Sequence, residues 1–336
     1  MRTSLSALLE TGRILLADGA TGTNFFERGL ESGEPPEFWN IDHPERVISL
    51  HQEFVDAGAD IILTNSFGGT QQRLKLHKAQ GRVHELNQRA AELARSVADA
   101  AARPVVVAGS VGPTGELFEP LGALTEAVAI ASFAEQAEGL KAGGADVCWI
   151  ETMSSIEEVR AAAMGAIQAG MPYTATLSFD TAGRTMMGIL PSTIRSVFDG
   201  LPVPPLAMGA NCGVGASDIL VSLLEMTADP GAARFISKGN CGVPKFVGTE
   251  AVYSGTPELM AAYAHLAGHA GASIVGGCCG TSPKHLAAMR EALDTYVVAP
   301  RPTIEAIVEA TGALCNSAPS ASSGEGRERR RAKRGE

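Results

Sequence analysis

The sequence predicts an α/β protein with a parallel sheet, most simply a single-domain (β/α)8 TIM-type barrel. Eight short apolar runs are spaced along the chain, each bounded by glycine or proline, and longer segments with helical periodicity lie between most of them. Strands that helices cover on both faces have such near-continuous apolar sequences. The runs are residues 14–17, 61–63, 105–108, 147–150, 173–177, 206–208, 235–237 and 273–275. A doubly wound open sheet is the alternative.

The segment between the first two runs shows the helical pattern most clearly. Val47, Leu50, Phe54 and Val55 fall on one face of a predicted helix, and Gly58 then ends it. A helix that precedes a buried strand in this way is the repeating unit of a (β/α)8 barrel.

Three junctions between helix and strand resemble one another. Residues 57–60, 143–146 and 270–273 each combine glycine with small or acidic residues directly before an apolar run. We expect each to be a glycine C-cap followed by a buried strand. A helix N-terminus is predicted at Ser155, because Ser155 and Glu158 have the spacing of a capping box.

Composition and charge exclude several classes of function. The chain has 27 Lys and Arg against 37 acidic residues, a net charge of -10, which argues against a nucleic-acid-binding surface. No run approaches the roughly 18 apolar residues of a membrane span. The six cysteines include no Cys-x-x-Cys pair and no regular close spacing, so they do not suggest a disulfide framework. We therefore expect a cytoplasmic protein without membrane or nucleic-acid partners.

The last segment differs from the rest of the chain. Residues 1–316 are predicted to form the barrel, and residues 317–336 a disordered basic tail that contains no large apolar side chain. The basic residues of this tail are Arg327, Arg329, Arg330, Arg331, Lys333 and Arg334.

Three cysteines follow predicted strands in glycine-rich settings. Cys278 and Cys279 lie in Gly-Gly-Cys-Cys-Gly after the last run, and Cys212 lies in Gly-Ala-Asn-Cys-Gly after the sixth. Glycine permits backbone angles at which two adjacent thiols point toward one site. Three thiolates with an open fourth position are typical of catalytic zinc. Two other interpretations stay open: small buried residues in a turn, and a phosphate-binding loop. Cys241, in a second Asn-Cys-Gly, is a reserve candidate.

Two carboxylates are expected at the same rim. Asp18 and Glu151 follow the first and fourth runs, and the carboxyl ends of barrel strands share one face. Carboxylates beside zinc suit a small amino thiol, with the sulfur on the metal and the ammonium on the acids. Either residue could instead only cap a helix or loop.

Five segments in this order resemble the zinc-dependent homocysteine S-methyltransferases. They are residues 16–23 (LADGATGT), 58–65 (GADIILTN), 109–114 (GSVGPT), 211–213 (NCG) and 276–281 (GGCCGT). The similarity covers about residues 15–293, and the Gly-Gly-Cys-Cys-Gly element with the upstream Asn-Cys is highly specific.

The resemblance implies a (β/α)8 barrel with a defined set of site residues. Zn²⁺ would be bound by Cys212, Cys278 and Cys279, and Asp18 and Glu151 would contact the amino group of homocysteine. In some relatives an asparagine that matches Asn240 occupies the fourth zinc position when substrate is absent. No catalytic residue beyond the zinc site is implied. The expected reaction is in-line methyl transfer to homocysteine, which forms methionine.

The methyl donor is the least constrained part of the resemblance. The short single-domain form resembles betaine–homocysteine methyltransferases, so betaine is the expected donor. A quaternary ammonium is best held by an aromatic cage, but Gly68 and Thr152 stand where the animal betaine enzymes place tyrosines. Other aromatic residues near the rim could form a different cage: Phe25, Phe26, Phe38, Trp39 and Phe67.

A different donor would require a partner protein. The alternative is that the chain is the homocysteine-activating subunit of a split cobalamin-dependent methionine synthase, supplied by a methyl-corrinoid protein. A sulfonium donor such as S-methylmethionine is a third possibility. Two further hypotheses are a phosphate-binding barrel enzyme and a non-catalytic component that delivers homocysteine.

Overall fold

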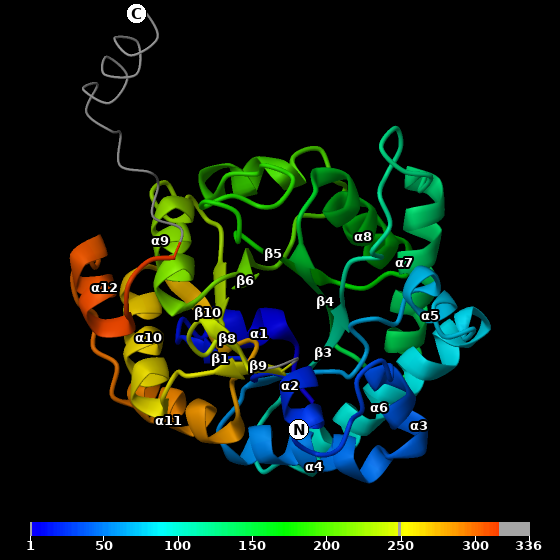
Figure 1. Cartoon of the computed structure of the whole chain (residues 1–336), viewed down its shortest axis with the longest axis horizontal. Helices are drawn as coiled ribbons and strands as arrows, with labels where there is room; N and C mark the ends of the chain where they lie inside the picture. The colour runs from blue at the N-terminus through cyan, green and yellow to red at the C-terminus, as the bar shows by residue number, and fades with distance from the viewer. Residues whose placement is uncertain (1, 248–249, 316–336) are drawn as a thin grey trace, which may run out of the picture.

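Eight parallel strands form a nearly closed barrel in the computed structural model, which describes residues 2–247 and 250–315, and helices surround it (Figure 1). The barrel strands are β1 (Leu15–Leu16), β2 (Ile61–Leu63), β3 (Val106–Val111), β4 (Val147–Met153), β5 (Tyr173–Leu177), β6 (Met208–Cys212), β7 (Phe235–Gly239) and β10 (Ala272–Gly277). Their order is β1-β10-β7-β6-β5-β4-β3-β2, and a parallel bridge from Ala17 to Ile61 joins β2 back to β1. The predicted (β/α)8 barrel is confirmed.

The predicted strands match the observed ones, with one displacement. The sixth was placed at residues 206–208, whereas β6 runs over Met208–Cys212 and carries Cys212 as its last residue. The connection from β5 to β6 contains the 3-10 helix η3 (Pro191–Phe198) in place of an α-helix. This irregular connection obscured the helical period before β6.

Helices occupy most of the connections between strands. The α-helices are α1 (Leu5–Glu10), α2 (Gly22–Phe26), α3 (Trp39–Asp42), α4 (Pro44–Asp56), α5 (Gln71–Lys75), α6 (Val83–Ala100), α7 (Glu126–Ala142), α8 (Ile156–Gln168), α9 (Ala216–Met226), α10 (Pro257–His269), α11 (Pro283–Asp294) and α12 (Ile304–Thr311). Two short 3-10 helices, η1 (Pro36–Phe38) and η2 (Gln80–Arg82), precede α3 and α6. In the described part of the chain, no helix combines the length and hydropathy of a membrane-crossing segment.

The predicted helix boundaries are largely confirmed. Helix α4 buries Val47, Leu50, Phe54 and Val55, and Gly58 follows it with a φ of 100°. At α8, Ser155 Oγ accepts the Glu158 N–H as predicted. The Glu158 carboxylate, however, accepts hydrogen bonds from the backbone N–H and hydroxyl of Thr114. This contact joins the start of α8 to the loop after β3.

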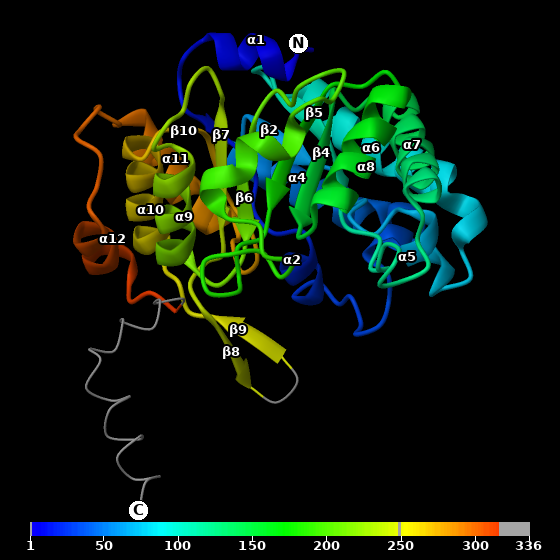
Figure 2. The same cartoon turned by 90° about the horizontal axis from the view of Figure 1, so that it is seen from above.

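The two ends of the barrel differ in structure (Figure 2). Helix α1 lies across one end, where Leu5, Leu8 and Leu9 pack against inward-facing residues of the strands, including Leu15, Ile61 and Trp149. At the opposite end a two-stranded antiparallel hairpin, β8 (Pro244–Val247) and β9 (Glu250–Tyr253), projects after β7. The sequence did not predict this hairpin. Burial of leucines at the α1 end leaves the other end open for a site.

The structure describes only part of the predicted division into a barrel and a tail. The described residues, 2–247 and 250–315, form the barrel strands, the helices, the β8–β9 hairpin and their connections. The predicted domain boundary at residue 316 stays a prediction. The predicted basic tail, residues 317–336, lies outside the described residues.

A buried carboxylate holds the α1 end of the barrel together. Asp60, which directly precedes β2, accepts two hydrogen bonds from the guanidinium of Arg13, at 2.8 and 2.9 Å, and a third from the Leu16 N–H at 2.9 Å. Arg103 and Arg290 lie 3.7 and 3.5 Å from its oxygens. Asp60 therefore links β1 to β2, where β1 is only two residues long.

We expect Asp60→Asn to destabilise the fold strongly. Removal of one charge from a buried ionic cluster typically lowers the free energy of unfolding by about 3 kcal/mol, and three arginines would then face a neutral group. Chemical denaturation measures this change. Asp229→Asn is the control, because Asp229 is 96% exposed in its contact with Arg195. Equal stability of Asp60→Asn and the parent protein would contradict this role.

Candidate metal centre

The three predicted cysteines meet at the carboxyl end of the barrel. Cys212 ends β6, and Cys278 and Cys279 directly follow β10. Their Sγ atoms all lie within 4.8 Å of one another, and Cys212 Sγ and Cys279 Sγ are 4.0 Å apart. All three line a cavity of about 520 Å³ at this end.

A left-handed backbone at Cys212 turns its thiol toward the other two. In a regular strand, Cys212 would point to the face opposite Asn211, whose side chain contacts neighbouring strands. Cys212 instead has a φ of 60°. Such angles are uncommon outside glycine and often mark functional sites.

Glycine allows the loop after β10 to present two adjacent thiols. A Cβ on Gly277 would lie 2.2 Å from the Thr281 side chain, and Gly280 has a φ of 78° with Tyr253 packed against it. The backbone N–H of Cys278 donates to Gly239 O at 2.7 Å, and the N–H of Cys241 donates to Cys279 O at 2.9 Å. The loop is thereby fixed to β7.

The donor set fits zinc. Tetrahedral zinc with Zn–S bonds of about 2.3 Å places its sulfur ligands ~3.8 Å apart, close to the separations in this trio. Contacts with Cys278 and Cys279 raise the pKa of Cys212, and burial acts in the same direction. Three thiolates this close need a compensating cation, which a divalent metal ion supplies. In the described residues, this trio is the one His, Cys, Asp and Glu cluster with such spacing.

The other candidate ligands lie around this trio. Asn240 donates to Gly213 O at 2.9 Å, and its Oδ1 accepts the Cys279 N–H at 3.1 Å, so its side chain bridges the two cysteine loops. Its predicted fourth position on the metal stays a prediction. Cys241 and Cys148 are buried outside the trio, and Cys315 is exposed.

Glu151 reaches the cavity from a distorted part of β4. The register between β4 and β5 shifts between Ile150 and Met153, and Thr152 has a φ of 62°. Asn211 holds this conformation, since it accepts the Thr152 N–H and donates to the Thr152 hydroxyl, both at 2.7 Å. Bulges of this kind re-aim a side chain.

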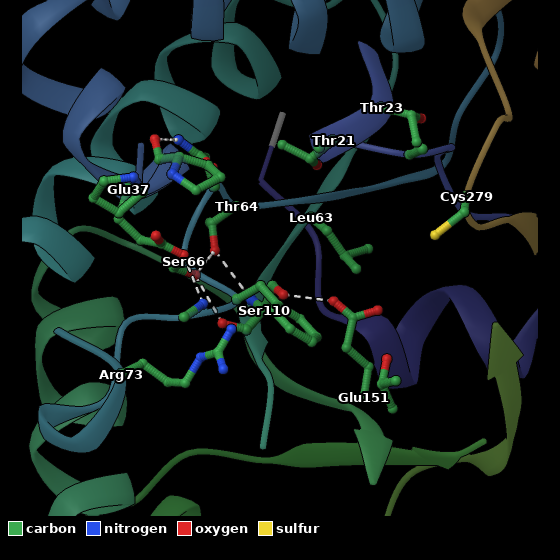
Figure 3. Close-up of a pocket in the computed structure, with 18 of the residues that line it drawn as sticks. Thr21, Thr23, Glu37, Leu63, Thr64, Ser66, Arg73, Ser110, Glu151 and Cys279 are labelled. Atoms are coloured by element: carbon green, nitrogen blue, oxygen red, sulfur yellow. Dashed lines mark hydrogen bonds between the residues drawn. The ribbon is translucent and has the colours of Figure 1, made fainter. Parts of the chain in front are cut away.

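One oxygen of Glu151 is fixed and the residue faces the cavity. Its Oε1 accepts the Ser110 hydroxyl at 2.5 Å (Figure 3). Burial raises the pKa of Glu151 to about 7, against the opposing effect of the Lys238 cation. A bound cation would therefore favour its ionised form.

Asp18 is buried and pairs with Lys238, a residue that was not predicted from the sequence. Lys238 Nζ donates to Asp18 Oδ1 at 2.9 Å, and the Leu63 N–H donates to Asp18 Oδ2 at 2.7 Å. Burial raises the pKa of Asp18, and the lysine opposes this effect. Lys238 lines the cavity with Glu151, whereas Asp18 does not. A signal existed in the sequence, because Lys238 is two residues after the buried Ile236 of the same strand.

The far end of the cavity is built by loops after β1 and β2. Glu37 and Arg73 lie there, opposite Cys279, with Glu151 between (Figure 3). Glu37 Oε1 accepts the Gly68 N–H at 2.6 Å; burial raises the pKa of Glu37, and Arg73 and His77 oppose this effect. This carboxylate was not identified from the sequence, because it is far from any strand end.

Of the five aromatic candidates, two line the cavity. Phe26 and Phe67 face it and are 55% and 36% exposed. Phe25 and Trp39 are buried and pack against each other, with ring centroids 5.0 Å apart. Phe38 packs against a small buried cluster formed by Leu74, Ala79, Val83 and Leu86.

Comparison with known proteins identifies the family. The profile of the homocysteine S-methyltransferases matches residues 15–293. The chain belongs to the homocysteine S-methyltransferase family. It is therefore a methyltransferase by family, as the sequence motifs predicted.

Two curated relatives are 31% and 30% identical to this chain. Both are named methionine synthase, from Mycobacterium leprae and Mycobacterium tuberculosis, and the matches cover 83% and 82% of this chain. The matched part is 24% of each relative, so the chain spans about a quarter of their length.

A solved structure shares the fold. The metallated form of the homocysteine methyltransferase MmuM from Escherichia coli superposes with a TM-score of 0.71 at 24% identity, over 85% of this chain and 98% of that one.

We expect the purified, reduced protein to contain about one zinc ion per chain, and Cys279→Ala to contain little. The variant should stay folded, because the apolar core does not include this thiol. Elemental analysis with circular dichroism tests both points. Cys241→Ala is the matched control and should keep its zinc. Full zinc content in Cys279→Ala would remove this residue from the ligand set.

Proposed function

We propose that the chain is a zinc-dependent S-methyltransferase that transfers a methyl group to the thiol of homocysteine and forms methionine. The observation that carries this proposal is the convergence of three thiols and a buried carboxylate, Glu151, on one cavity of about 520 Å³. A cavity of this size accommodates an amino acid together with a small methyl donor. The six unpaired cysteines support a reducing compartment such as the cytoplasm.

Each part of the cavity has a role in this reaction. Zinc bound by Cys212, Cys278 and Cys279 would supply Lewis acidity that keeps the substrate sulfur ionised at neutral pH. Glu151, held by Ser110, accepts the substrate ammonium. The sulfur then forms a bond to the donor methyl carbon as the bond from that carbon to the donor atom breaks, and its electron pair stays with the donor. The cavity walls align homocysteine and the methyl donor for this transfer.

We propose betaine as the methyl donor. The support comes from the cavity lining, which includes the rings of Phe26 and Phe67 and the Glu37 carboxylate. Aromatic faces and a carboxylate attract a quaternary ammonium. Arg73, in the same wall, offers a cation to the carboxylate of betaine. Dimethylglycine would be the second product.

A second candidate function is the homocysteine-activating subunit of a split methionine synthase. The observation that favours it is the match to a quarter of two proteins named methionine synthase. Gly68 and Thr152 also offer no aromatic face. A separate methyl-corrinoid protein would then bring the methyl group to the same thiol.

Replacement of Glu151 tests the substrate end. We expect Glu151→Ala to weaken homocysteine binding about 10- to 100-fold, because a buried charge-assisted hydrogen bond is lost, while zinc content stays unchanged. Calorimetry on the zinc-loaded protein measures the affinity. Glu157→Ala, at an exposed position of α8, is the control. An unchanged affinity in Glu151→Ala would remove the carboxylate from the substrate site.

The donor is tested by methionine formation from homocysteine with betaine alone. We expect turnover, and a KM for betaine about 10-fold higher in Phe67→Leu because a cation–π contact is lost. Homocysteine affinity should be the same in both proteins. Absence of turnover with zinc and homocysteine bound would contradict betaine. Methionine formation after addition of a methyl-corrinoid protein would then establish the second candidate.

A further inference from the structure

Lys238 is a buried cation in the cavity wall, beside the predicted substrate position. Its side chain is 2% exposed, and it lines the cavity together with Glu151 and the three cysteines. Lysine is almost never fully buried unless it is paired. A buried lysine in the cavity wall therefore needs acceptors for its ammonium group, either from the protein or from a bound ligand.

Asp18 satisfies only part of the hydrogen-bonding capacity of the Lys238 ammonium. An ammonium group has three N–H donors. In the described residues, one hydrogen bond is made, to Asp18 Oδ1 at 2.9 Å, and the group also lies 5.6 Å from the ring centroid of Trp149. The remaining donors need an acceptor, because an unmatched buried donor is costly.

Asp18 is enclosed by its neighbours and has little access to a ligand. One oxygen accepts from Lys238 and the other from the Leu63 N–H, and the residue is 1% exposed. It does not line the cavity. This position indicates that Asp18 holds Lys238 in place and does not itself contact the substrate.

Lys238 and Glu151 together present opposite charges to the same space. Among the described residues, no ion pair with an N···O distance of 4.0 Å or less joins Lys238 to Glu151. The two charges still interact, since Lys238 lowers the pKa of Glu151 and Glu151 raises the pKa of Lys238. The gap suits a molecule with an ammonium and a carboxylate on one carbon, and its thiol would lie toward Cys212, Cys278 and Cys279.

We propose that Lys238 binds the α-carboxylate of the amino-acid substrate, with Asp18 as its positioning residue and Glu151 as the acceptor of the ammonium. This assignment rests on the proposed function. It gives Asp18 an indirect role, in contrast to the direct contact with the amino group that the sequence resemblance implies.

The experiment compares three thiols by calorimetry on the zinc-loaded protein. They are homocysteine, 3-aminopropane-1-thiol, which lacks the carboxylate, and 4-mercaptobutanoate, which lacks the ammonium. We expect the parent protein to prefer homocysteine over 3-aminopropane-1-thiol by about 10- to 100-fold. Lys238→Met should bring this ratio close to one. Lys284→Met, at an exposed position on α11, should leave it unchanged.

A second variant guards against a fold that fails when Asp18 is left buried without its partner. The double change Asp18→Asn with Lys238→Met removes both charges, and replacement of a whole buried pair is often tolerated. It should lose the same preference for the carboxylate. Asp18→Asn alone should reduce the carboxylate preference and leave the preference for homocysteine over 4-mercaptobutanoate intact.

The outcomes separate this assignment from the proposed function. If Lys238→Met weakens homocysteine and 3-aminopropane-1-thiol by the same factor, the lysine has a structural role and the assignment is wrong. If Asp18→Asn instead abolishes the preference over 4-mercaptobutanoate, Asp18 contacts the ammonium directly and its positioning role is overturned. Absence of homocysteine binding by the parent protein would overturn the proposed function, and the assignment with it.

Discussion

The adjacency of β6, β7 and β10 in the closed sheet is the constraint on which the metal centre depends. Parallel register places Cys212 beside Gly239, and Gly239 beside Gly277. The hydrogen bond from the Cys278 N–H to Gly239 O extends this pairing beyond β10. A shift of one residue in either pair would move a thiol by about 3.3 Å, whereas ligand distances in a metal site vary by about 0.2 Å. Strand register, fixed by the apolar barrel, therefore sets the geometry of the thiols.

The two ends of the barrel divide stability from chemistry. At the α1 end, leucines fill the interior and Asp60 joins β1 to β2 through paired charges. At the other end, Lys238 and Glu151 are buried in a wall that could have been apolar. Burial of charge is unfavourable unless it is compensated, and here the Asp18 carboxylate compensates the lysine only on one side. The Lys238 ammonium and the Glu151 carboxylate line the cavity, so the amino-acid substrate that we propose would balance both charges.

Much of this arrangement was predictable because it depends on local patterns. Apolar runs marked all eight barrel strands, and the residues after them included the three cysteines and Glu151. Lys238 was missed, although it is two residues after Ile236 in the same strand, because Asp18, the partner that allows a lysine to be buried, is 220 residues away in sequence. The left-handed backbone at Thr152 was equally hidden, since it depends on hydrogen bonds between Thr152 in β4 and Asn211 in β6, two strands away. Hydrophobic periodicity does not predict contacts between residues that are far apart in sequence, and these contacts fix Lys238 and Thr152.

The part of the cavity that we propose for the methyl donor is built from other elements than the part that holds the thiols. It is built from α2, η1 and the segment around Phe67, all in connections after β1 and β2, whereas the thiols come from β6 and β10. Phe25 and Phe26 are neighbours in α2, yet the first is buried and the second lines the cavity, so the phase of a five-residue helix decides which ring meets a ligand. Loops of this kind can change sequence without moving β6, β7 or β10. The same thiol chemistry can therefore be combined with different methyl donors by changes in these connections alone.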